Sequence, residues 1–125
     1  MKLSTLLVVK AVISLAFGIA LALIPTLLMS LYGATLDASG ALMARLVGAC
    51  LIGIGLVCWL NRTADAKLLQ GITLALCIGD AVGFIVTLLG QLAGVANALG
   101  WVNVIIWLLM ALGLGYFRFL KPSAA

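Results

Sequence analysis

The fold is decided by residues 68–117, which read LLQGITLALCIGDAVGFIVTLLGQLAGVANALGWVNVIIWLLMALGLGYF. Asp80 is the only charged side chain in this stretch. A single helix of that length would extend about 75 Å, because each residue adds about 1.5 Å, whereas crossing the hydrocarbon core of a bilayer takes about 20 residues. The stretch must therefore fold back. Turn-forming Gly, Gln and Asn cluster at residues 90–97, which predicts one span at about 68–89 and another at about 98–117.

Two further apolar stretches of span length lie upstream, at about residues 6–28 and 41–60. The chain is 66% hydrophobic and 8% charged, whereas roughly a quarter of the residues in soluble domains are charged. A length of 125 residues leaves room for one domain. The sequence therefore predicts an all-α fold in which residues 1–125 form a single transmembrane domain, an integral membrane bundle of four transmembrane helices.

The cations indicate the direction of the four spans. Four spans place both termini and the 61–67 loop on one side, and that side carries Lys2, Lys10, Arg62, Lys67, Arg118 and Lys121. The opposite loops, 32–40 and 90–97, contain Asp37 and no Lys or Arg. Lys and Arg concentrate in cytoplasmic loops. We therefore expect a multi-pass protein of the cell's inner (plasma) membrane with its N- and C-termini in the cytoplasm.

Composition argues against most enzyme chemistry. The chain contains no His and no Glu, which removes the commonest general bases and metal ligands. Its three cysteines, Cys50, Cys58 and Cys77, form no Cys-x-x-Cys pair, and buried free cysteines usually behave as small hydrophobic residues. We therefore predict no catalytic residue, no metal site, no cofactor and no enzyme activity, while a bound lipid or pigment stays open. The cations lie at span ends rather than in one stripe, so no nucleic-acid partner is expected.

Asp80 is the leading candidate for a functional side chain. An ionised carboxylate in mid-bilayer costs at least about 2–3 kcal/mol, so it must be paired, protonated or hydrated. At about 1.5 Å per residue, Arg45 lies roughly 6 Å, Asn103 roughly 8 Å and Asp80 roughly 15 Å from the non-cytoplasmic ends of their spans. These depths predict a contact between Arg45 and Asp80 in that half of the membrane, with Asn103 bridging them.

The helix of Asp80 also carries a stripe of polar or semi-polar side chains. They recur at helical spacing and so share one face of the span. Besides Asp80, the stripe contains Thr73, Cys77, Thr87 and Gln91. We expect this face to point into the bundle.

Small residues recur at four-residue spacing along the spans, where the backbone of a neighbouring helix could approach closely. The predicted packing positions are Ser14, Gly18, Ala22, Gly48, Ala49, Gly53, Gly79 and Gly83. Packing inside the bundle explains these positions better than a dedicated dimer face.

Three interpretations of the cluster around Asp80 stay open. A buried ion pair could fix how the helices fit together. A buried carboxylate could instead act as a proton or cation site when a cavity opens. The cluster could also contact a partner subunit, a lipid or a pigment.

Three short motifs stand out along the chain. They are Pro25 near the end of the first span, the stretch ARLVGA at residues 44–49, and Asp80-Ala81-Val82-Gly83 in the third span. With these motifs the chain resembles a set of uncharacterised bacterial four-helix membrane proteins, known only as domains of unknown function. The resemblance covers most of the chain. It implies a bacterial four-helix membrane fold and supplies no activity.

A chain without a soluble part or a catalytic constellation is typical of an accessory or scaffolding subunit that packs against a larger membrane complex. The alternative is a small homo-oligomeric transporter or channel that is coupled to protons or cations through Asp80. Small multidrug-type transporters have about this length, but they place an essential glutamate in their first helix, and this chain has no Glu. We expect its partners to be the lipid bilayer and either another membrane protein or further copies of the chain.

Overall fold

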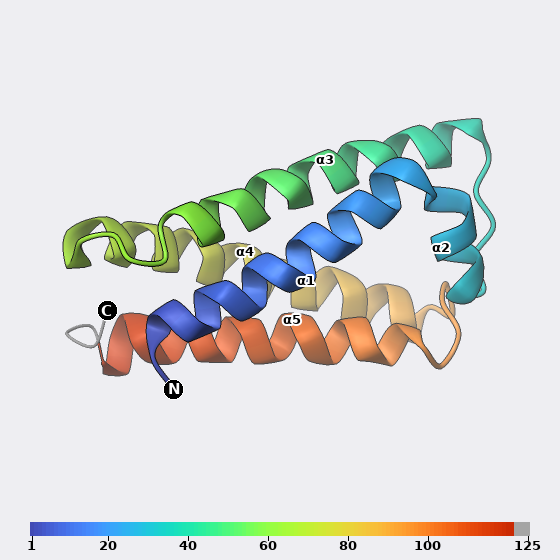
Figure 1. Ribbon diagram of the computed structural model, residues 1–125. Helices are drawn as coiled ribbons and strands as arrows, with labels where there is room; N and C mark the ends of the chain where they lie inside the picture. Colours follow the sequence, from blue (N-terminus) through green and yellow to red (C-terminus); the bar gives the residue numbers. More distant parts are fainter. Residues whose placement is uncertain (122–125) are drawn as a thin grey trace.

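The computed structural model describes residues 1–121. Its α-helices are α1 (Leu3–Leu23), α2 (Pro25–Leu31), α3 (Ala38–Leu60), α4 (Ala66–Leu92) and α5 (Gly100–Gly115), and a π-helical turn, η1 (Tyr116–Leu120), continues α5 (Figure 1). Four segments are long and apolar enough to cross a membrane: Leu3–Leu23, Ala38–Leu60, Ala66–Leu92 and Gly100–Leu120. The prediction of an all-helical chain with four helices of membrane-spanning length is confirmed.

The first span ends earlier than predicted because Pro25 breaks it. α1 stops at Leu23, and Ile24 leaves helical geometry with φ −133° and ψ 52°. Proline has no N–H to donate and its ring clashes with the preceding turn, yet its fixed φ suits the first turn of a new helix. Pro25 accordingly begins α2. Residues 25–28, predicted as part of the first span, belong to this short helix instead.

Two aspartates set where α3 and α4 begin. The Asp37 side chain accepts a hydrogen bond from Gly40 N at 2.7 Å, and the Asp65 side chain accepts one from Leu68 N at 2.9 Å. Each carboxylate satisfies an N–H that the first turn of a helix leaves unpaired, and its charge suits the positive end of the helix dipole. Both helices therefore start slightly before the spans that hydropathy alone predicts.

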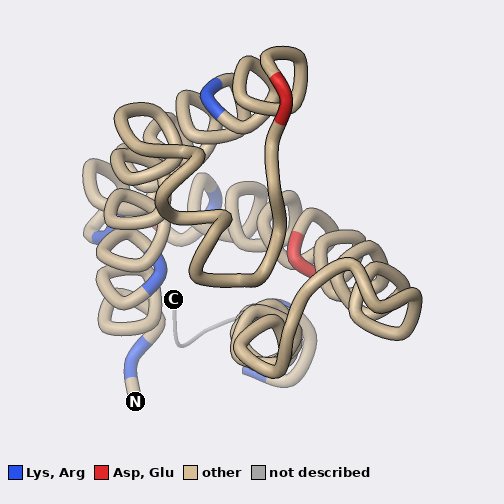
Figure 2. The backbone as a smooth tube through the Cα atoms, turned by 90° about the vertical axis from the view of Figure 1, so that its right-hand side faces the viewer, with Lys and Arg blue, Asp and Glu red and all other residues tan. Residues whose placement is uncertain are grey.

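The four long helices form an open arc. α1 packs along α3, and α4 packs along α5, while the first part of α1 also contacts α5. α3 and α4 are joined by the short 61–65 turn but diverge from it, so they make few contacts with each other. Seen from the end that holds α2, α3 and α4 form the two ends of the arc, with α1 and α5 between them (Figure 2).

The helices meet most closely at the end of the molecule where α1 begins. Every long helix contributes to the buried core there, which consists of Leu3, Leu6, Leu7, Ala11, Cys58, Leu69, Leu114 and Phe117. The start of α1 and the turn η1 lie at this same end (Figure 1). Successive long helices run in alternating directions, so a chain with four of them begins and ends at the same end of the molecule.

Hydrogen bonds between loops hold the opposite end together. Asn97 N donates to Tyr32 O at 2.8 Å, and Asn97 Nδ2 donates to Leu31 O at 3.0 Å. The Tyr32 hydroxyl donates to Asn103 Oδ1 on α5 at 3.3 Å. Burial raises the pKa of the Tyr32 hydroxyl, and the hydrogen bond to Asn103 offsets part of that rise. Tyr32 therefore stays protonated at neutral pH and keeps its donor.

Glycine allows α1 and α3 to approach backbone to backbone. A Cβ atom on Gly48 would lie 2.6 Å from Gly18 O and 2.7 Å from Ala22 N, closer than real Cβ contacts. Ser14 is buried one turn before Gly18 on the same face of α1. In the other packed pair of helices, α4 and α5, the ring of Trp107 on α5 covers Gly83 of α4. The predicted packing positions that lie between helices are Ser14, Gly18, Ala22, Gly48 and Gly83.

Three predicted packing positions face outwards instead. A Cβ atom on Gly53 or Gly79 would meet nothing within 4 Å, and Ala49 is exposed. The prediction that these residues pack inside the bundle is therefore wrong for the single chain. The physical reason is the open arc, because α3 and α4 diverge and leave their outer faces without a neighbouring helix.

Candidate functional site

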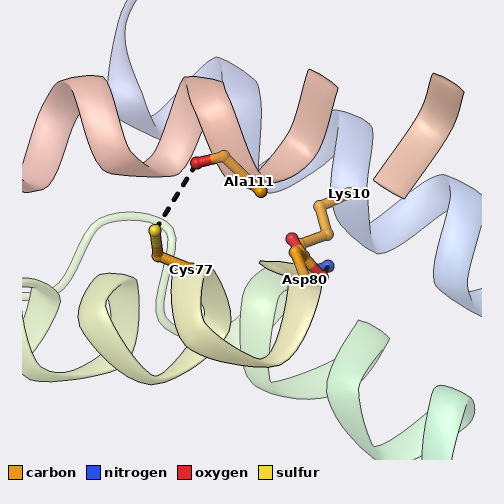
Figure 3. A network of polar contacts seen from close by, with 4 residues as sticks. All are labelled: Lys10, Cys77, Asp80 and Ala111. Carbon is orange, nitrogen blue, oxygen red and sulfur yellow. Dashed lines mark hydrogen bonds and ion pairs between the residues drawn. The ribbon is translucent and has the colours of Figure 1, made fainter. Parts of the chain in front are cut away.

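A buried ion pair joins the two halves of the arc. Lys10 Nζ donates to Asp80 Oδ1 at 2.6 Å, and the two side chains are only 7% and 3% exposed (Figure 3). Lys10 lies on α1 and Asp80 on α4, two helices that otherwise make few contacts. Each group compensates the charge of the other, as ionised side chains inside an apolar bundle require.

The predicted contact between Arg45 and Asp80 is wrong. Arg45 Nη1 donates instead to the carbonyl of Ala22 near the end of α1, 2.6 Å away, and the arginine is exposed. Asn103, predicted as a bridge between the two charges, accepts a hydrogen bond from Tyr32. The depth of a residue along its span does not define the angle between two spans. α3 and α4 diverge, so similar depth does not bring their side chains together.

Sequence reasoning counted Lys10 among the cytoplasmic charges and missed its partner. A usable signal was present, because Lys10, Ser14 and Gly18 follow one another at four-residue spacing and so share one face of a helix. A lysine on a face that packs against other helices is buried, and a buried lysine needs an acid. Asp80 is the acid inside a predicted span, since Asp37 and Asp65 lie in loops.

Lys10 and Asp80 differ in the further contacts that each of them makes. The indole ring of Trp107 lies 5.7 Å from Lys10 Nζ, within range of an attractive cation–π interaction. On the other side, Asp80 Oδ2 is buried and accepts no hydrogen bond from any residue that the structure describes. Lys10 thus has a second attractive contact, whereas Asp80 accepts no second hydrogen bond from residues 1–121.

The other members of the polar stripe on α4 make separate contacts. Thr73 is buried, and its Oγ1 has no hydrogen-bond partner among residues 1–121. Cys77 Sγ donates to the carbonyl of Ala111 on α5 at 3.5 Å (Figure 3). Thr87 bonds back to its own helix, and Gln91 Nε2 donates at 2.9 Å into the loop before α5. The stripe therefore does not form one continuous polar chain.

A cavity of about 200 Å³ lies beside the ion pair, between α1, α3 and α5. Its polar lining comes from Lys10, Ser14 and Asn103, and the rest of its wall is apolar, including Phe17 and Trp107. Two of the residues singled out from the sequence, Ser14 and Asn103, meet there, although one was predicted for helix packing and the other for the charge cluster.

The described part of the chain, residues 1–121, brings no three His, Cys, Asp or Glu side chains together as metal ligands. Cys50 is exposed, Cys58 is buried and Cys77 is partly buried, and all three are free. Within the described residues, the buried ion pair Lys10–Asp80 and the polar lining of the neighbouring cavity lie side by side.

No family model matches the chain, and the searches of curated proteins and of solved structures found no match. The resemblance to bacterial four-helix membrane proteins stays a prediction.

Proposed function

We propose that this chain is a non-catalytic, multi-pass protein of a cell's inner (plasma) membrane and serves as an accessory subunit of a larger membrane complex. The observation that supports an accessory role is that the outer surfaces of α3 and of α4 both carry uncovered glycines. Gly53 on α3, and Gly71 and Gly79 on α4, have no atom within 4 Å of where a Cβ would lie. Small residues that expose the backbone of a membrane helix are typical of contacts with further helices.

A partner helix on this surface gives a specific expected result. Replacing both Gly53 and Gly79 by leucine should leave the chain folded, because open space surrounds both positions. The same change should reduce the recovery of a co-purifying partner at least about tenfold, the effect of roughly 1.4 kcal/mol of lost packing. The measurement is mild detergent extraction of the tagged chain from its native membrane, followed by particle size and identification of companions.

The matched control for that experiment is Val12→Leu, on the exposed face of α1. It should leave particle size and companions unchanged. A wild-type chain that extracts without companions, or a double glycine variant that keeps all of them, would contradict the accessory role.

The orientation in the membrane has its own test. We expect a fluorescent-protein fusion at the C-terminus to fluoresce and a periplasmic alkaline phosphatase fused there to be inactive, because Lys and Arg gather on that side. Phosphatase fused within the 93–99 loop, on the opposite side, should be active and serves as the control. The reverse pattern would overturn the proposed cytoplasmic termini.

A second candidate function is proton or cation translocation by a homo-oligomer. The supporting observation is the buried Asp80 Oδ2, which lacks a hydrogen-bond donor among the described residues. The salt bridge weighs against this candidate, because Lys10 already compensates the carboxylate. A dimer or tetramer of this chain alone in the extraction experiment would favour translocation over the accessory role.

A further inference from the structure

The cavity beside the ion pair has the size of a single ring. It holds about 200 Å³ between α1, α3 and α5. An apolar cavity of about 150 Å³ in a protein interior accepts benzene. A six-membered ring with small substituents therefore fits this space.

The polar lining of the cavity consists of hydrogen-bond donors. Ser14 is 6% exposed and lines the cavity, and its hydroxyl can donate a hydrogen bond. Asn103 uses its Oδ1 to accept from Tyr32, which leaves its Nδ2 hydrogens free. Lys10 gives one N–H to Asp80 and has two more. An occupant that satisfies these groups must carry acceptors.

The charge of the cavity indicates a neutral occupant. Lys10 is already compensated by Asp80 at 2.6 Å, and Asp80 itself is not part of the lining. An anion would have to compete with that contact, and a cation would meet an ammonium group. A carbonyl group accepts hydrogen bonds without bringing a charge.

The apolar wall indicates a flat and lipid-soluble occupant. Trp107 and Phe17 present aromatic side chains to the space, and aromatic rings associate in stacked or edge-to-face pairs. Val47 on α3 also lines the cavity while being 51% exposed, so the cavity is continuous with the outer surface of the helix pair. A molecule dissolved in the bilayer can enter from there, and an apolar tail can remain outside.

We propose that this cavity binds a neutral, lipid-soluble molecule whose head is a flat ring bearing carbonyl acceptors, the chemistry of the quinone class. Ser14 and Asn103 donate to the carbonyl oxygens, and Trp107 lies against the ring. The site is formed within one chain and does not depend on the partner complex proposed above.

The test uses the purified full chain in phosphatidylcholine nanodiscs, titrated with a ubiquinone analogue that carries a ten-carbon tail. Trp59→Phe with Trp101→Phe leaves Trp107 as the only tryptophan, and its fluorescence should be quenched in a saturable manner. The matched control is Trp59→Phe with Trp107→Phe, which leaves Trp101, on the same helix but outside the cavity lining. That control should show only the shallow, non-saturating quenching of collisions in the bilayer.

Loss of one donor should weaken binding measurably. Ser14→Ala in the single-Trp107 chain should raise the Kd for the quinone about three- to tenfold, the range expected for one hydrogen bond. Ser4→Ala, a second serine on α1 outside the lining, should leave the Kd unchanged. Helical circular dichroism must be the same for all variants.

Three results would overturn the proposal. One is equal quenching of Trp107 and Trp101, and another is an equal effect of Ser14→Ala and Ser4→Ala on the Kd. The third is a tightly held phospholipid, detected by native mass spectrometry, that the quinone does not displace, because the ester carbonyls of a lipid would then occupy the donors.

Discussion

Replacing Lys10 by methionine should lower the free energy of unfolding by about 3–5 kcal/mol, the usual cost of removing one partner of a buried ion pair. Asp80 would then have to take up a proton or stay ionised without a partner, in a site where its side chain is 3% exposed and its Oδ2 has no hydrogen bond from residues 1–121. Methionine retains most of the aliphatic volume of lysine, so the loss reports charge rather than packing. The measurement is unfolding of the purified chain by denaturing detergent, followed by circular dichroism.

The double variant separates pairing from packing. Asp80→Leu alone should cost a similar amount, because it leaves the Lys10 ammonium group uncompensated beside Trp107. Lys10→Met together with Asp80→Leu should recover most of the loss, since an apolar pair avoids the desolvation of two charges. Arg45→Met is the control and should change stability by less than about 1 kcal/mol, because Arg45 is exposed. Additive effects of the two single changes would show that the ion pair does not form.

The four spans could be read from the sequence because length and hydropathy almost suffice to define them. A membrane-length helix needs a long apolar run, and the stretch from residue 68 to residue 117 is too long for a single crossing. The ends of the spans are harder to predict, because they depend on single side chains. Pro25 ends α1 early, and the Asp37 and Asp65 caps begin α3 and α4 early.

The sequence predicts only part of the candidate site, because the site depends on the angles between helices. The need for a partner at Asp80 follows from burial alone, and the structure supplies one. The choice between Arg45 and Lys10 is harder, because each lies on a small-residue face of its own helix. Only the structure shows that Lys10 of α1 meets Asp80, whereas Arg45 of α3 bonds to the carbonyl of Ala22. Periodicity places a residue on a face of its own helix but does not say which helix that face meets.

The small residues likewise show that the sequence does not say which faces of a helix meet a neighbouring helix. Gly48 and Gly53 lie on one helix, and from the sequence both belong to plausible packing faces. In the structure a Cβ atom on Gly48 would meet the backbone of α1, whereas a Cβ atom on Gly53 would meet nothing within 4 Å. Their difference arises from the position of α1, which covers one side of α3 and leaves the other side free.

Gly48→Ala should therefore destabilise the chain by about 1–3 kcal/mol, the usual cost of inserting a methyl group into a packed contact. The added Cβ would lie 2.6 Å from Gly18 O and 2.7 Å from Ala22 N. Both atoms belong to backbone, so α1 and α3 must move apart along the contact. Gly53→Ala is the control and should be neutral or stabilising by up to about 1 kcal/mol, because alanine favours helix and nothing lies within 4 Å. Detergent unfolding measures both, and equal effects would contradict the close packing of α1 on α3.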